Sequence, residues 1–185
     1  MGKGFEIGPI RPPSEASSLL LRITRNCSWN RCKFCNLYRD EKFSTRPMEE
    51  IKADIDQVAL LRNNIMEWTK TNNIRDLTRV NKILYEKIGH EPSEIVQRYR
   101  NVLHWLNRES DSVFLQDANT VALSFNKLLE ILLYLKEKLP QVKRVTSYGR
   151  VDSLAKFSIA EWTQLREAGL NRIHSGYESG SDKVL

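Results

Sequence analysis

Short segments that contain apolar or β-branched residues, each long enough for one strand, occur at four places along the chain. They are Leu19–Thr24, Ser112–Leu115, Val142–Thr146 and Arg172–His174. Runs of this length, bounded by polar or turn-forming residues, predict strands.

Between these runs, apolar residues recur at every third or fourth position, which predicts helices with one buried face. The first helix is predicted to begin at Pro47, a residue suited to a first turn. Glu49 and Glu50 follow it, and their charges suit the positive end of the helix dipole. The predicted buried face holds Met48, Ile51, Ile55 and Val58.

Two further helices carry clear end signals. The span Phe125–Leu139 has apolar residues on one face and stops before Pro140. A third helix is predicted after Ser158, which stands three residues before Glu161 in a capping box, and it ends at Gly169.

The remaining segments divide the chain into a leader, a core and an insertion. Residues 1–18 are rich in Gly, Pro and Ser and predict an extended leader. Residues 19–185 form the predicted core. Within it, residues 63–110 are polar and mostly helical in pattern, with a helix start at Pro92, and they indicate a helical insertion between the first and second strand–helix units.

The alternation of strand and helix predicts an α/β fold with about four parallel strands and crossover helices. Polar, motif-like residues follow the carboxyl end of each predicted strand. Active sites lie at that end in (β/α) barrels, so we expect a partial barrel with its site there.

Charge and hydropathy add few constraints. The net charge of +6 is spread among alternating basic and acidic residues, which permits nucleic-acid partners without indicating them. No apolar run is long enough to span a membrane, and the first residues lack the apolar core of a secretory signal. We therefore expect a cytoplasmic protein whose thiols are reduced and which has no membrane partner.

The three cysteines of the chain, Cys27, Cys32 and Cys35, lie within nine residues, directly after the first predicted strand. An odd, clustered set does not suit a disulfide framework. Thiolates are the ligands that iron–sulfur clusters require, and a 4Fe–4S cluster has four irons. Three ligands would leave one iron open to a small molecule.

This cysteine loop resembles the signature of radical S-adenosylmethionine enzymes, in which an aromatic residue precedes the last cysteine. Phe34 stands in that place. The usual spacing is C-x3-C-x2-C, whereas this chain has C-x4-C-x2-C. The segments Phe114–Asn119, Thr146–Arg150 and Gly176–Ser181 also resemble this superfamily, and most closely its oxygen-independent coproporphyrinogen oxidase-like branch.

The resemblance implies a radical enzyme with two cofactors. Cys27, Cys32 and Cys35 would ligate a 4Fe–4S cluster, whose fourth iron would bind S-adenosylmethionine. Reductive cleavage would release a 5′-deoxyadenosyl radical that abstracts hydrogen from a substrate the sequence does not identify. The electron would come from a reductant such as flavodoxin or ferredoxin.

The resemblance also assigns cofactor contacts by position. Phe34 would lie beside the adenine, and Asp117 would bind the methionine amino group. Glu178 would hydrogen-bond the ribose, and Ser147 and Arg150 would line the same face. The family barrel has six strand–helix units, so the chain is expected to be an amino-terminal fragment.

Other interpretations of the same residues stay open. The chain could be a zinc- or cluster-binding module that contacts nucleic acid. In the zinc case, His90, His104 or His174 would be the fourth ligand beside the three cysteines. The chain could also be a non-catalytic remnant of the family. Asp117 could cap a turn, Glu178 could start a helix, and Ser147 and Arg150 could be turn residues.

Overall fold

The computed structural model describes residues 5–74, 79–80, 82–83, 86, 93–108, 111–176, 180–181 and 183. Its centre is a sheet of four parallel strands in the order β1-β4-β5-β6. These strands are β1 (Leu19–Arg22), β4 (Ser112–Gln116), β5 (Arg144–Tyr148) and β6 (Leu170–His174). The predicted α/β class with four parallel strands is confirmed.

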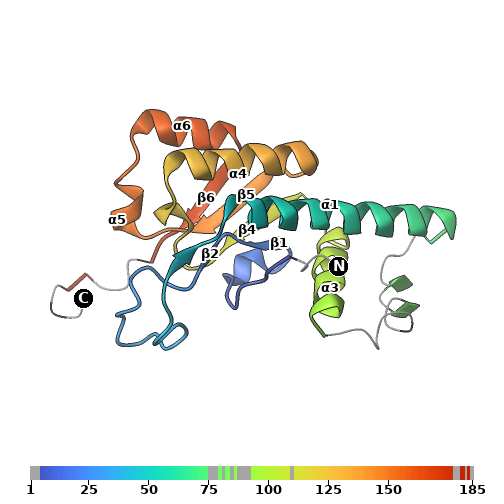
Figure 1. The fold of residues 1–185 in the computed structure, drawn as a ribbon, viewed down its shortest axis with the longest axis horizontal. Coiled ribbons are helices and arrows are strands. Elements are labelled where there is room, and N and C mark those ends of the chain that lie inside the picture. The colour runs from blue at the N-terminus through green and yellow to red at the C-terminus, as the bar shows by residue number, and fades with distance from the viewer. Residues whose placement is uncertain are drawn as a thin grey trace.

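Helices cover one face of this sheet (Figure 1). They are α1 (Met48–Thr71), α4 (Phe125–Lys138) and α6 (Ile159–Glu167). Residues at alternate strand positions, such as Leu21, Val113 and Val145, share a core with the apolar faces of the helices. α3 (Ser93–Leu106) packs against α1 and β1.

The helix predictions agree closely with the structure. Ile51, Ile55 and Val58 of α1 are buried, and Met48 packs against the core at its edge. α1 extends to Thr71 because buried Leu61 and Ile65 continue the same face, so residues 63–71 continue this helix.

The other two helices also begin as predicted. α4 starts at Phe125, and α6 has the expected capping box, in which the Ser158 side chain accepts from the Glu161 amide and the Glu161 carboxylate accepts from the Ser158 amide. α3 begins at Ser93, next to the predicted helix start at Pro92, which lies outside the described residues.

Three strand predictions need correction. β6 begins at Leu170, two residues before the predicted Arg172, because Leu170 pairs with Val145 of β5. β5 begins at Arg144, not Val142, because the Val142 amide donates to the Leu139 carbonyl in the turn after α4. β5 then extends to Tyr148, so Ser147 lies within a strand and not in the loop after it.

The first predicted strand is also divided. β1 ends at Arg22, and Thr24–Arg25 form β2, which pairs with β3 (Ser44–Thr45) in an antiparallel ladder. The chain changes partner at Ile23, whose amide donates to Gln116 and whose carbonyl accepts from Arg46. The β2–β3 ladder therefore closes the base of the cysteine loop.

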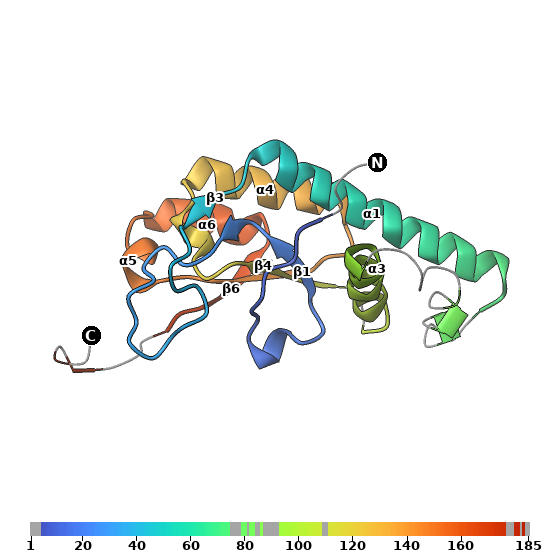
Figure 2. The ribbon, with the colours of Figure 1, turned by 60° about the horizontal axis from the view of Figure 1, so that its bottom comes forward.

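The leader begins on the helix side of the sheet, where Phe5 is buried in the core and the Glu6 amide donates to Asp54 of α1 at 3.0 Å. From Gly8 onward it packs on the face opposite the helices (Figure 2), and the Gly8 amide donates to the Gln116 side chain at 2.9 Å. A 3-10 helix, η1 (Pro13–Glu15), carries a fully buried carboxylate at Glu15. The predicted extended leader is thus a packed part of the fold from Phe5 onward.

Glu15 is held by partners from across the sheet. The Ser18 hydroxyl donates to it at 2.6 Å, His174 Nε2 lies 3.4 Å away, and Arg144 lies 3.6 Å away. Burial alone would raise the pKa of Glu15, but these hydrogen bonds and the Arg144 charge outweigh it and lower the pKa.

No helix within the described ranges is both long enough and apolar enough to cross a lipid bilayer.

The substitution Glu15→Gln should remove a pH-dependent part of the stability. A carboxylate with a lowered folded-state pKa stabilises the fold above its ordinary pKa of 4.5, and this contribution disappears as pH falls through the folded value. We expect the variant to lose about 1–2 kcal/mol of unfolding free energy near pH 6, and the difference from wild type to shrink near pH 3. Urea unfolding of both proteins at pH 6 and pH 3 measures this difference in unfolding free energy.

Glu67→Gln is the control, because Glu67 is exposed on α1. A loss for Glu15→Gln that stays the same at both pH values would contradict the assignment of an ionised, stabilising Glu15.

Candidate cofactor-binding site

A pocket of about 660 Å³ lies where the cysteine loop meets the carboxyl edge of the parallel sheet. Ala118 after β4, Tyr148 and Gly149 at the end of β5, and His174 at the end of β6 line it from the sheet. The carboxyl ends of parallel strands meet at one edge, and the topology therefore brings these separate segments together. A pocket of this size suits a small molecule.

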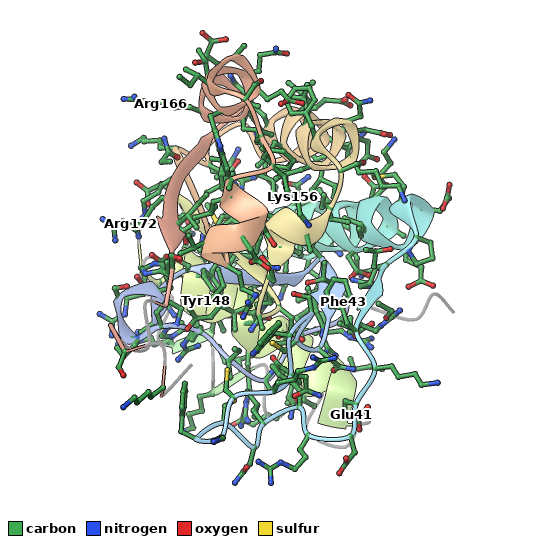
Figure 3. The ribbon with its side chains drawn as sticks, turned by 90° about the vertical axis from the view of Figure 1, so that its left-hand side faces the viewer. Glu41, Phe43, Tyr148, Lys156, Arg166 and Arg172 are labelled. Atoms are coloured by element: carbon green, nitrogen blue, oxygen red, sulfur yellow. The ribbon has the colours of Figure 1, made fainter. Side chains whose placement is uncertain are left out.

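Figure 3 shows this end of the molecule. Tyr148 lies near the middle of the view at the end of β5, Phe43 lies at about the same height, and Glu41 lies lower. Arg166 lies in the helical layer above.

All three cysteines line the pocket. Cys27 and Cys32 are half-buried, Cys35 is exposed, and none forms a disulfide. The Asn30 amide donates to Cys27 Sγ at 3.4 Å, and the Cys35 amide donates to the Cys32 carbonyl at 3.3 Å. The loop is therefore turned so that its three sulfur-bearing residues face one space.

The donor set fits an iron–sulfur cluster by its chemistry. Three soft thiol ligands border one pocket, which is what a cluster bound through three irons needs. Among the residues that the structure describes, no three side chains of His, Cys, Asp or Glu gather closely enough to hold a single metal ion.

Two of the predicted cofactor contacts lie on this pocket. Phe34 lines it and is 68% exposed, so its ring is available to a ligand. Arg150 also lines it, and its guanidinium lies 4.6 Å from the centre of the Trp29 ring. Arg31 contacts the same ring at 5.4 Å.

Ser147 does not lie at the pocket. Ser147 alternates with Tyr148 along β5, and it is buried and absent from the pocket lining. Its hydroxyl has no hydrogen-bond partner within the described part of the chain. Glu178 lies outside the described residues.

Asp117 is fully buried and does not line the pocket, which is reached instead by its neighbour Ala118. Its Oδ2 accepts from Arg22 Nη2 at 2.7 Å and from the Asn26 amide at 3.1 Å. Its Oδ1 accepts from the Tyr38 hydroxyl. The carboxylate thus binds groups of this chain, an arrangement that does not favour the predicted contact with the methionine amino group.

Tyr38 is a site residue that sequence reasoning missed. Its ring lines the pocket while its hydroxyl reaches Asp117. Burial, together with the Asp117 carboxylate, raises its pKa above the ordinary range, so the phenol stays protonated and donates. No local pattern identifies this residue, because its contact depends on the path of a long loop.

Asn119 joins three segments around the pocket. Its Nδ2 donates to the hydroxyls of Ser28 and Ser153, each at 2.8 Å, and its Oδ1 accepts from the Arg150 amide at 3.1 Å. The sequence could have identified Asn119 as a site residue, because polar residues that follow a parallel strand lie at the carboxyl edge of the sheet, where sites form.

Comparison with protein-family models, with curated proteins and with solved structures finds no match to this chain.

Replacing Asn119 with alanine should destabilise the protein strongly. The change removes three hydrogen bonds and leaves buried Ser153 without its amide donor. We expect a loss of about 2–3 kcal/mol of unfolding free energy in urea. Asn101→Ala on α3 is the control, since its side chain makes one weak contact with the Leu20 carbonyl at 3.4 Å. Equal effects of the two changes would contradict the joining role of Asn119.

Proposed function

We propose that this chain is a radical S-adenosylmethionine protein that binds a 4Fe–4S cluster through Cys27, Cys32 and Cys35. The observation that carries the proposal is the pocket, because the three cysteines and the ends of three parallel strands line the same space. The sequence resemblance to this superfamily lies in the same segments.

The loop places a backbone N–H donor beside Cys27. The amide of Asn30 faces Cys27 Sγ, and such N–H donors stabilise the anionic thiolate that a cluster requires. Arg31 and Arg150 contact the same Trp29 ring beside the pocket, so their positive charge would offset part of the charge of the cluster. When bound, the cluster would supply the electron that cleaves S-adenosylmethionine.

Other residues of the pocket would hold the small molecule. Phe34 and Tyr148 offer aromatic faces, and Phe34 is the more exposed of the two. Arg150 offers a cation that suits a carboxylate. Ile10, Leu37 and Val151 add apolar surface to the pocket.

We also propose that the four-stranded sheet is part of a (β/α) barrel, whose interior face is the one that carries Tyr148 and His174. This face holds polar and aromatic groups, whereas the opposite face packs on helices. Barrel sites are built from the carboxyl ends of such strands.

A zinc site is the second candidate, because His174 lines the same pocket as the three cysteines, although these four side chains would have to move closer together to bind one ion. A Cys3His set is a common structural zinc site. The two candidates make different predictions for His174, which is a ligand only in the zinc site.

Electron paramagnetic resonance tests the proposal. The full chain is reconstituted anaerobically with iron and sulfide and reduced with dithionite. We expect a reduced 4Fe–4S signal that changes when S-adenosylmethionine is added, because the cofactor would bind the iron that has no cysteine ligand. Cys27→Ser should lose most of the signal.

His174→Ala is the matched variant, and it should retain the iron content of the wild type. Protein that binds zinc and no iron, with zinc lost in His174→Ala, would contradict the proposal and support the zinc site. A signal that S-adenosylmethionine does not change would contradict an open iron.

A further inference from the structure

Tyr38 is the one inward-facing residue of a mostly exposed loop. Of residues 26–45, all of which the structure describes, only Tyr38 has a buried side chain. The cysteine loop therefore has a single point at which a side chain is inserted into the body of the protein. The hydroxyl at the end of this side chain reaches Asp117.

Asp117 offers this loop a fixed anchor at the edge of the sheet. Its carboxylate is fully buried directly after β4, and a buried charge is stable only with close partners. Arg22 of β1 supplies the countercharge at 2.7 Å. The remaining donors, the Tyr38 hydroxyl and the Asn26 amide, both belong to the cysteine loop.

Hydrogen bonds within the loop connect Tyr38 to the rest of the loop, so that fixing Tyr38 also restricts the residues around it. The Asn30 side chain donates to the carbonyls of Tyr38 and Glu41. The Asn26 side chain donates to the Lys42 carbonyl at 2.8 Å. The segment with the three cysteines thus spans two points, Asn26 and Tyr38, that bind the same carboxylate.

We propose that Tyr38 and Asp117 are positioning residues that hold the cysteine loop against the sheet, so that Cys27, Cys32 and Cys35 face the pocket together before any metal is bound. The consequence for cluster binding rests on the proposed function. The docking of the loop itself does not.

Hydrogen exchange on the metal-free full chain tests the docking. Tyr38→Phe keeps the ring and removes the hydroxyl that binds Asp117. We expect amides of residues 26–43 to exchange about ten times faster in this variant near neutral pH, because a hydrogen bond to a charged group that holds the closed state is lost. Mass spectrometry of peptides from this loop measures it.

Tyr134→Phe is the matched control, because Tyr134 of α4 also donates to a carboxylate, Asp56 of α1, at 2.8 Å. It should leave exchange in the loop unchanged. Exchange in the strands β4 and β5 should stay at the wild-type level in both variants, which separates local release of the loop from general destabilisation.

Asp117→Asn provides a second variant that keeps one acceptor oxygen for Tyr38. We expect faster loop exchange than in wild type, as Asn26 and Arg22 lose a charged partner. Loop exchange at the wild-type rate in Tyr38→Phe would overturn the proposal, as would an equal increase in Tyr134→Phe.

Iron uptake after reconstitution separates the two claims. Tyr38→Phe should bind less iron than Tyr134→Phe at limiting iron concentration. If wild type binds no iron, the proposed function fails, and the exchange data still decide whether Tyr38 and Asp117 dock the loop.

Discussion

The arrangement around the pocket depends on one buried carboxylate. Asp117 lies at the carboxyl end of β4 and binds β1 through Arg22 and the cysteine loop through Tyr38 and Asn26. Because the charge is fully buried, each of these partners is needed to offset its desolvation. A single group therefore connects β1 and β4 to the segment that carries every cysteine of the chain.

One face of the sheet packs in the apolar core, and the other leads to the pocket. One face packs on α1, α4 and α6 through aliphatic side chains, which gives the molecule its apolar core. The other face carries polar and aromatic side chains. The leader provides partners for three of them: Glu6 binds Arg22, the Gly8 amide donates to Gln116, and Glu15 lies beside His174. At the carboxyl edge of this face, the strand ends and the cysteine loop together line the pocket.

Sequence periodicity predicted the helical layer well, because helix faces and the Ser158 capping box depend on residues close in sequence. Strand ends were less accurate, since the start of β5 depends on its pairing with β4 and on the turn at Val142. The three cysteines, Phe34 and Arg150 line one pocket, and the cofactor contacts predicted for them stay predictions. The engagement of Asp117 by Tyr38 was missed, because no local pattern encodes a contact between residues 79 positions apart.

The central claim is that three cysteines on a docked loop hold a cluster with one open iron. Mössbauer spectroscopy of the chain reconstituted with ⁵⁷Fe tests it most directly, since the method resolves iron sites by their ligands. The account predicts a 4Fe–4S cluster in which one iron out of four becomes distinct when S-adenosylmethionine is added. Four irons that all remain unchanged on adding S-adenosylmethionine, or a chain that retains no cluster, would contradict it.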